Sequence, residues 1–413
     1  MADRLRFIQV GTGGWGGCWC RDFLPRLVKM GRIEPAAAVD ANPEALKNAQ
    51  QSYGIPPERC YTDAKKAFAE VQADFAIIVV PPAHHEAIVD LAVAKGMHIL
   101  SEKPIADSMA ACARIYHKVK RAGLKMAVTM SHRFDQDKQS LERLIRSGEF
   151  GACHYLVGRN TWNCRKFPSW GAFRYKIADT LLVEGTVHHF DIMRSLAGAN
   201  AKTVYCRSWN APWSDFQGDS SALITIEMEN GIKVFYEGSK TNATTLNGWG
   251  QDYWRAECEK ATLELDNRRL RVLSDLGCER QITEKHLAQQ PVWMNAWLAE
   301  QFVDWLGGGP EPPNSLDDNI QCAALLFAAI ESAHTGQVVD VQRFLRDQLG
   351  SAEDAKKEPD ESAKHAKRTR KNSPEKAFHH GLPSVAFGHN QTPNPKLQPP
   401  NKSQYTNHEP QTT

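Results

Sequence analysis

The residue pattern with the clearest chemical meaning combines a lysine in a predicted turn with a downstream histidine between two carboxylates. Lys103 lies in the segment Ser101-Glu102-Lys103-Pro104, directly after the apolar run 98–100. If that run is a strand of an open α/β sheet, Lys103 points into the ligand crevice at its carboxyl end. Its ammonium group could then stabilise negative charge on a substrate oxygen, and the X-Pro bond could be cis. The alternative is a surface ion pair between Glu102 and Lys103.

The second part of this pattern lies in the segment 182–191. Glu184 and His188 are four residues apart, and His188 and Asp191 three apart, so a helix would place all three on one face. A carboxylate beside an imidazole fixes its tautomer and raises its basicity, which suits a general acid or base near neutral pH. A structural, hydrogen-bonded role is the alternative for the histidines. No further ligand cluster accompanies the segment, so we expect no metal.

A glycine-rich turn predicts a dinucleotide site. The sequence Gly11-Thr12-Gly13-Gly14-Trp15-Gly16 follows the apolar run 5–10 and precedes a helical pattern at 17–30, which is the context that gives this motif its meaning. Its glycines permit a tight turn, close approach to a pyrophosphate, and packing of the helix on the strand. Asp40 ends the second apolar run and could accept hydrogen bonds from a ribose. Residues 41 and 42 carry no cation for a 2′-phosphate, so NAD is favoured over NADP.

The elements that must position these residues form two different patterns. In the first third, short apolar runs at 5–10, 36–39, 74–80, 98–100 and 125–129 alternate with helical segments. Strands alternating with helices predict a doubly wound parallel sheet of the Rossmann type, which we assign to residues 1–129. After a helix near 138–147, strand-like segments lie at 153–159, 203–208, 222–229, 232–239, 254–258, 261–265 and 270–273, and helices at 291–306 and 316–335. Residues 130–348 are therefore expected to form an α+β domain with a large, mainly antiparallel sheet.

Composition excludes several classes of protein. The formal net charge is only +2, so no strong field attracts nucleic acid or a membrane surface, and no apolar run approaches the roughly 20 residues that span a bilayer. Ten scattered cysteines favour reduced thiols in a cytoplasmic protein over a disulfide scaffold. Residues 349–413 are polar and rich in proline, which predicts a disordered tail.

Tryptophans add a separate signal for the substrate. Six of the eleven lie between residues 162 and 254, and aromatic faces pack well against the C–H faces of sugars. Trp162, Trp170 and Arg174 precede the histidine segment, where a loop could cover a substrate. Core or subunit-interface packing is the alternative for any one of these rings.

Together, the glycine motif, Asp40, Pro81 with His85, Glu102-Lys103-Pro104 and the segment 184–191 resemble the Gfo/Idh/MocA oxidoreductase family over about residues 4–345. The resemblance implies a Rossmann domain that binds NAD or NADP and a C-terminal open sheet that often forms the interface of a homo-oligomer, a dimer or tetramer. It implies cofactor contacts at Pro81, His85 and Glu102, a catalytic Lys103, and His188 as the acid or base. Glu184 matches a position where the family usually has aspartate, and Asp191 one where an acid contacts substrate hydroxyls.

The resulting hypothesis is an NAD-dependent dehydrogenase acting on a hydroxyl or carbonyl of a sugar, cyclitol or related polyol. Two alternatives remain open. One is redox-neutral glycoside cleavage through transient oxidation by tightly bound NAD, and the other is a non-catalytic NAD or carbohydrate sensor. Two departures from the family stand out: no Gly-Gly pair precedes the histidine segment, and glutamate replaces aspartate at residue 184. The longer side chain of Glu184 can reorganise its contact with His188.

Overall fold

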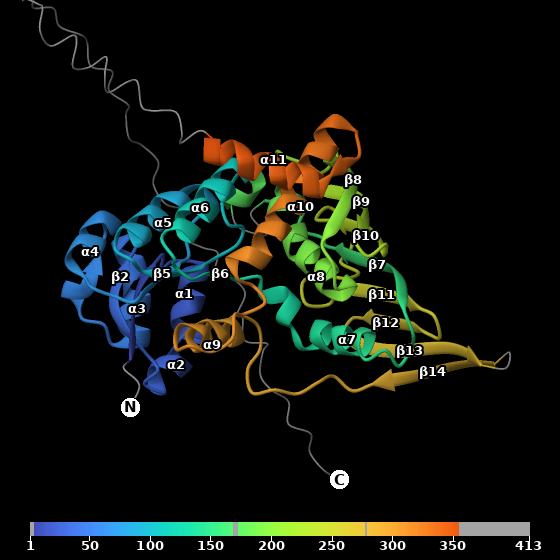
Figure 1. Cartoon of the computed structure of the whole chain (residues 1–413), viewed down its shortest axis with the longest axis horizontal. Helices are drawn as coiled ribbons and strands as arrows, with labels where there is room; N and C mark the ends of the chain where they lie inside the picture. Colours follow the sequence, from blue (N-terminus) through green and yellow to red (C-terminus); the bar gives the residue numbers. More distant parts are fainter. Residues whose placement is uncertain (1–3, 168–171, 277–278, 355–413) are drawn as a thin grey trace, which may run out of the picture. The chain divides into compact units, whose positions relative to one another are not determined.

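The computed structural model describes residues 4–167, 172–276 and 279–354, which are arranged around two β-sheets (Figure 1). The first sheet has six parallel strands in the order β3-β2-β1-β4-β5-β6. They are β1 (Leu5–Val10), β2 (Ile33–Val39), β3 (Cys60–Tyr61), β4 (Phe75–Ile78), β5 (His98–Ser101) and β6 (Met126–Val128). Short, almost wholly apolar runs suit strands that helices cover on both faces, and all four residues of β4 are buried. The prediction of a Rossmann-type sheet is confirmed.

The helices of this part follow the strands closely, with two local differences from expectation. They are α1 (Trp15–Cys18), α2 (Pro25–Lys29), α3 (Leu46–Tyr53), α4 (Ala64–Glu70), α5 (His85–Ala94) and α6 (Met109–Arg121), with a π-helical turn at Trp19–Phe23. The single helix expected at 17–30 is divided, because Pro25 takes the first position of α2. Ser108 caps α6 by accepting a hydrogen bond from the Ala111 amide, although the preceding Asp107 is also a residue type favoured at this position.

The second sheet has nine strands in the order β14-β13-β12-β11-β7-β10-β9-β8-β15. They are β7 (Cys153–Thr161), β8 (Ala201–Trp209), β9 (Ser221–Met228), β10 (Lys233–Ser239), β11 (Tyr253–Cys258), β12 (Thr262–Asp266), β13 (Arg269–Leu276), β14 (Glu279–Lys285) and β15 (Val339–Asp340). Only β7 and β10 pair in parallel, so the expected mainly antiparallel sheet is confirmed. Gly231, with a φ of 87°, closes the β9–β10 hairpin.

The remaining helices link the two sheets. They are α7 (Gln136–Arg146), α8 (Val187–Ala197), α9 (Met294–Leu306), α10 (Leu316–Thr335) and α11 (Val341–Asp354), with short turns at Ser131–Phe134, Ala172–Lys176 and Leu182–Thr186. Every residue of α8 is buried, and α10 packs against both α8 and β8. Helix α9 belongs to the second half of the chain but packs on the first sheet, where Phe302 contacts Phe75 (Figure 1).

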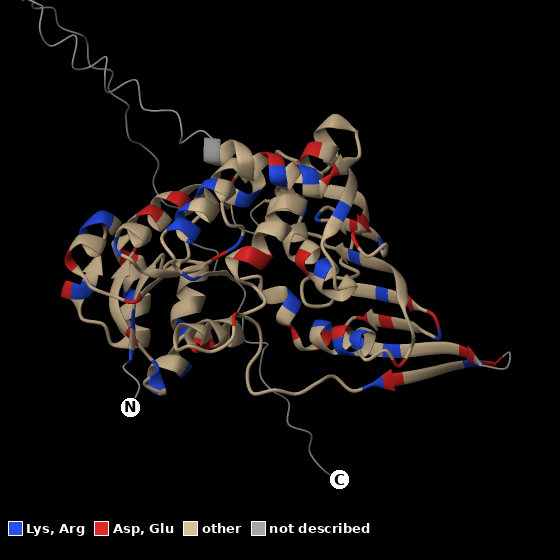
Figure 2. Ribbon diagram, in the orientation of Figure 1, with Lys and Arg blue, Asp and Glu red and all other residues tan. Residues whose placement is uncertain are grey.

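The distribution of charged residues and the hydropathy of the helices agree with the small net charge and the short apolar runs of the sequence. Basic and acidic residues are interspersed along the helices and strands around both sheets (Figure 2). No helix in the described part of the chain has the length and apolar character needed to cross a membrane. Helix α11 extends to Asp354, beyond the domain boundary expected at residue 348, and residues 355–413 lie outside the described residues.

Candidate functional site

The glycine turn lies at the carboxyl end of β1, next to the end of β4. Gly11 has a φ of 91°, and a Cβ atom there would lie 2.0 Å from the carbonyl oxygen of Val79. A Cβ atom on Gly16 would lie 2.3 Å from the Gly11 oxygen. Side chains at either position would therefore push the turn away from the sheet. The close packing predicted for these glycines is present.

The same turn has the donors that a pyrophosphate needs. Among the described residues, no group accepts a hydrogen bond from the backbone N–H of Gly14 or Trp15, which lie where α1 begins. Gly14 is open on its outer side, since a Cβ atom added there would have no other atom within 4 Å. Exposed N–H groups at a helix start are a suitable anion site, so this turn fits the phosphates of NAD.

Asp40 follows β2 and organises the turn from the other side. Its Oδ2 accepts hydrogen bonds from the amides of Thr12 and Gly13, at 2.8 and 2.9 Å, and its Oδ1 accepts one from the Asn42 amide. A carboxylate has about four acceptor positions, so these three bonds leave capacity for a ribose hydroxyl. Asp40 is only half-buried, and its placement fits the adenosine side of NAD.

Glu102 sits inside the first sheet's crevice and binds the helix that follows the glycine turn. Its Oε1 accepts hydrogen bonds from the indole N–H groups of Trp15 and Trp19, at 2.6 and 2.8 Å. Burial raises the pKa of the Glu102 carboxyl, although both indole bonds favour the charged form. Glu102 therefore fixes the π-helical turn at Trp19–Phe23 and the partly exposed Trp15 ring, both adjacent to the cofactor turn.

His85 contacts the backbone of the turn that carries Lys103 and so helps to fix its position. The peptide bond Lys103-Pro104 is cis. His85 is fully buried, with Nε2 2.9 Å from the carbonyl of Val80 and Nδ1 3.1 Å from that of Pro104. It thus connects the end of β4 to the lysine turn. Pro81 is exposed beside it, where the chain leaves β4. Direct contacts of Pro81 and His85 with a cofactor stay predictions.

Lys103 reaches from this turn to the histidine segment of the second half of the chain. Its Nζ donates to the carbonyl oxygen of Glu184 at 3.1 Å and lies 3.7 Å from the Glu184 carboxylate. Arg174 donates from Nε to the same carboxylate at 2.9 Å. Burial opposes ionisation of Glu184, but the surrounding cations outweigh it and lower its pKa to about 2. Glu184 is therefore an anion that lies among cations.

His188 lies next to this group but is not paired with Glu184, contrary to expectation. The described hydrogen bonds and ion pairs of Glu184 join it to Lys103 and Arg174 and not to His188. The reason is local: Glu184 lies in the π-helical turn Leu182–Thr186, so a spacing of four does not place it over His188 as in an α-helix. Burial and the charge of Lys103 hold the pKa of His188 well below its usual range, so the ring is neutral.

The residues predicted to contact the substrate do not all lie at the same place in the structure. Asp191 is buried and pairs with Arg133 at 3.0 Å, away from Glu184, and burial raises its pKa to about 6. Trp162 is half-buried and packs edge-on against Trp249, whose ring also meets His188 edge-on. Trp170 lies outside the described residues. Arg174 and Trp162 thus border the Lys103–His188 region, whereas Asp191 is paired with Arg133.

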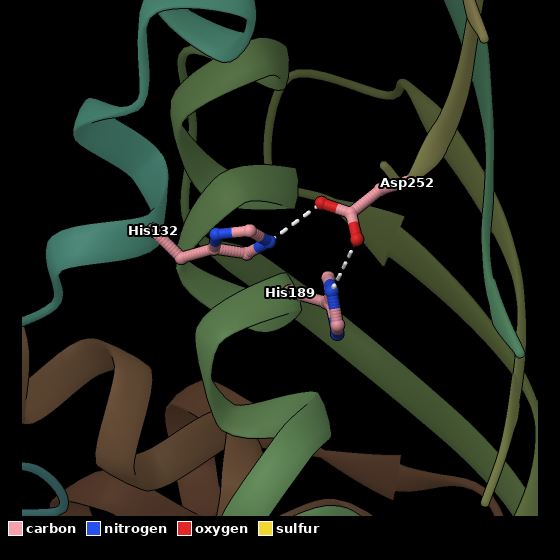
Figure 3. Close-up of side chains that lie close together, drawn as sticks. All are labelled: His132, His189 and Asp252. Atoms are coloured by element: carbon pink, nitrogen blue, oxygen red, sulfur yellow. Dashed lines mark hydrogen bonds and ion pairs between the residues drawn. The ribbon is translucent and has the colours of Figure 1, made fainter. Parts of the chain in front are cut away.

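A buried network of charged groups lies next to His188, and Figure 3 shows three of its members, His132, His189 and Asp252. Asp252 accepts from His132 Nε2 at 2.6 Å and lies 3.0 Å from Lys138 Nζ and 3.6 Å from His189 Nε2. His132 stacks on Trp249, with ring centroids 4.1 Å apart. Burial opposes charging of His132, but its carboxylate neighbours raise its pKa to about 9. A cationic His132 therefore supports the Trp249 ring that contacts His188.

The geometry of this network is that of charge-assisted hydrogen bonds. His132, His189 and Asp252 are the group of described residues whose ligand atoms could converge on a metal ion, within 4.8 Å of one another. The 2.6 Å contact between His132 Nε2 and Asp252 Oδ2 has the length of a charge-assisted hydrogen bond, and the Lys138 ammonium already faces the same carboxylate oxygen. The cationic His132 and Lys138 thus neutralise the Asp252 carboxylate, as a bound metal ion would otherwise do.

Several residues of the site were missed by the sequence interpretation. His132 follows β6, at the carboxyl edge of the first sheet, and that position was a usable signal. Lys240 follows β10, is 5% exposed, and donates from Nζ to the Thr180 carbonyl at 2.7 Å. Nothing in the local sequence distinguishes Lys240 or Asp252 from surface charges, because β-sheet pairing brings them to the site.

Comparisons with known sequences agree with this geometry. The family described as "Oxidoreductase family, NAD-binding Rossmann fold" matches residues 5–130, and the family described as "GFO/IDH/MocA C-terminal domain" matches residues 139–264. The chain is 44% identical to the uncharacterized protein y4oX of Sinorhizobium fredii over 348 residues, covering 83% of this chain and 97% of that protein. It is 25% identical to a D-apiose dehydrogenase of Rhizobium rhizogenes, covering 75% and 91% of the two chains.

Solved structures show the same fold. An oxidoreductase from Agrobacterium radiobacter, determined in complex with NAD+, L-tartaric acid and magnesium, superposes with a TM-score of 0.71. The two chains are 22% identical, and the match covers 82% of this chain and 99% of the other. At this identity the comparison supports the arrangement of the two sheets.

Proposed function

Because the chain belongs to the Gfo/Idh/MocA family of NAD-binding oxidoreductases, we propose that it is a dehydrogenase that oxidises a hydroxyl group of a sugar, cyclitol or related polyol, or reduces the corresponding carbonyl. The observation that carries the proposal is the meeting of Lys103, from the cofactor-binding half, with Glu184 next to His188. A relative named D-apiose dehydrogenase supports a polyhydroxylated substrate.

The chain's own residues can perform the proton chemistry of this reaction. When bound, NAD supplies the acceptor for the hydride that leaves the substrate carbon. A ring nitrogen of neutral His188 accepts the hydroxyl proton, so the carbon–oxygen bond can become a carbonyl. The Lys103 ammonium stabilises the negative charge that develops on the oxygen before the proton has fully left. Glu184, through its contact with Nζ, holds Lys103 in position.

Each cofactor residue has a proposed role that matches its place. The Gly11–Gly16 turn, with Thr12, Gly13, Gly14 and Trp15, binds the pyrophosphate, and Asp40 binds the ribose and favours NAD over NADP. Glu102 orients the Trp15 ring, and His85 and Pro81 shape the turn that carries Lys103. Trp162 and Arg174 border the substrate.

The test measures near-ultraviolet absorbance of reduced nicotinamide after mixing the protein with NAD and a panel of sugars and cyclitols. We expect one class of polyol to raise the absorbance. Lys103→Met and His188→Asn should each lower turnover by about 100-fold or more while NADH binding persists. Lys125→Met is the matched control, because its Nζ donates to the Trp305 carbonyl, outside the site. The assigned roles would be contradicted by a folded mutant that loses NADH binding without any specific loss of turnover.

The outer face of the second sheet suggests how the enzyme assembles. Large apolar side chains are exposed there, among them Phe235 at 44% and Leu223 at 43%. We expect this face to pair in a homo-oligomer, a dimer or tetramer, as the family resemblance implies. Light scattering of Phe235→Asp against the unmodified protein tests this, since an unchanged mass would exclude the face. A cytoplasmic location stays a prediction from the cysteine content.

A further inference from the structure

Two cysteines lie directly opposite each other on neighbouring strands of the second sheet. Cys153 is the first residue of β7 and Cys258 is the last residue of β11, and the antiparallel register pairs them (Figure 1). Cys60 and Cys206, the other cysteines in the described strands, lie opposite an alanine and an isoleucine. Cys153 and Cys258 are therefore the pair that strand pairing itself brings together.

The backbone hydrogen bonds around this pair favour close approach of the two side chains. The Glu259 amide donates to the Ala152 carbonyl at 3.0 Å, one position beyond the cysteines on each strand. In an antiparallel ladder this makes Cys153 and Cys258 a non-hydrogen-bonded pair, whose Cα atoms lie about 4.5 Å apart with both side chains on one face. A disulfide requires Cα atoms about 4.4 to 6.8 Å apart, so the backbone already has a suitable spacing.

Both thiols are also placed where a small molecule can reach them. Each is half-buried at the border of the apolar core, and Cys258 lines an open groove beside Glu259 and Lys260. The two sulfur atoms are close enough to share a hydrogen bond, which lowers the pKa of Cys258 and raises that of Cys153. Cys258 is therefore the thiol that ionises first, and the thiolate is the nucleophile in disulfide exchange.

We propose that Cys153 and Cys258 are a redox-modification site that forms a reversible disulfide when a low-molecular-weight disulfide acts as the oxidant. The Cys258 thiolate attacks one sulfur of the oxidant and releases the first small thiol, which leaves a mixed disulfide on Cys258. Cys153 then loses its proton, attacks Cys258 Sγ and releases the second small thiol. The two released thiols carry away the two protons and two electrons that the cysteines lose.

The disulfide would fasten two strands that lead to the candidate site at their other ends. Trp162 directly follows β7, and Asp252 directly precedes β11. Because β7 has nine residues, the cysteines lie roughly 30 Å from Trp162, so the bond leaves the site itself unchanged. It closes a loop of about 100 residues, which restricts the unfolded chain and stabilises the folded one. The inference goes beyond the proposed dehydrogenase function and does not depend on it.

The experiment incubates the full chain with oxidised or reduced glutathione, alkylates the remaining thiols and analyses the tryptic peptides by mass spectrometry. Trypsin places Cys153 in the peptide 147–159 and Cys258 in the peptide 256–260, each with a single cysteine. We expect these two peptides to be linked after oxidation, with a mass two hydrogen atoms below their sum, and to separate after dithiothreitol treatment. Free thiols at both positions, glutathione retained on Cys258, or linkage of either residue to another cysteine overturns the inference.

Variants connect the bond to stability. Oxidation should raise the urea midpoint of the unmodified protein by about 1 M and leave those of Cys153→Ser and Cys258→Ser unchanged. Cys153→Ser should also accumulate the mixed disulfide on Cys258, because the second attacking thiol is missing. Cys60→Ser is the matched control, since Cys60 is another half-buried strand cysteine and its variant should keep both the linkage and the shift. An unchanged midpoint in the oxidised unmodified protein, or an equal shift in Cys153→Ser, overturns the inference.

Discussion

The stability of the protein should depend on pH through one buried histidine beneath the site. His132 lies within 2.7 Å of both Asp135 and Asp252, and its pKa is raised to about 9 against about 6.5 in an unfolded chain. A raised folded-state pKa contributes stability that is complete below about pH 6.5 and is lost as pH rises through about 9. The shift corresponds to about 3 kcal/mol, lost at about 1.4 kcal/mol per pH unit.

The perturbation is His132→Gln, measured by urea unfolding at several values between about pH 7 and 8.5. Over that range the His132 contribution should fall by about 2 kcal/mol in the unmodified protein and be absent from the variant. Lys240 titrates with the opposite sign, because its lowered pKa means that the unfolded chain binds more protons. The quantity to measure is therefore the difference between the two profiles, in which Lys240 cancels.

Three other groups face His132 and must be considered. The neighbouring imidazoles of His188 and His189 have lowered pKa values, so they titrate below the chosen range. Lys138 is held charged, as its pKa is raised by the same carboxylates. Asp252→Asn removes the main source of the shift and should flatten the profile as well. Parallel profiles for the unmodified protein and His132→Gln would refute the reasoning, because they would show that His132 is neutral in the folded state.

Three further predictions concern the cofactor turn and the general base. Asp40→Ala should weaken NADH binding by about tenfold or more and reduce the preference for NAD over NADP. Fluorescence titration with NADH and NADPH measures both effects, and an unchanged ratio of the two affinities would contradict the assignment. Gly16→Ala should abolish cofactor binding, because its Cβ would overlap the Gly11 carbonyl. Gly54→Ala is the control: Gly54 has a φ of 68° and open surroundings, so this change should cost about 1 kcal/mol of stability and leave cofactor binding unchanged. The value of kcat/KM should stay constant as the pH is lowered to about 6.5, because the pKa of His188 is lowered. A decrease centred above about pH 7 would show that Glu184 raises the pKa of the imidazole after all.

The first sheet and its turn were predictable because their signals are local. Gly11 and Gly16 are fixed by the sterics of one strand–turn–helix unit, and Asp40 directly follows the next strand, so the signals all lie within about the first 40 residues. Lys103 was predictable for the same reason, as it directly follows β5. The strands expected at 222–229 and 232–239 and the helix expected at 316–335 were also correct, because turn residues and helix caps are short-range signals.

The rest of the site depends on contacts between distant parts of the chain. Asp252 reaches His132 across 120 residues, and Lys103 reaches Glu184 across 81. Strand order decides these contacts, and periodicity carries no information about strand order. β14 was missed for a different reason: its side chains are exposed and polar, so it has no alternation of apolar residues.

The π-helical turn at Leu182–Thr186 explains why this site differs from a carboxylate–imidazole pair. An extra residue in the turn rotates Glu184 away from His188 and toward Lys103 and Arg174. His188 then lies among cations and stays neutral, which leaves it able to accept a proton but without a carboxylate to strengthen it as a base. The longer glutamate at residue 184 and the neutral state of His188 are therefore consistent with one another, because the carboxylate pairs with Lys103 and Arg174 and leaves the imidazole unpaired with it.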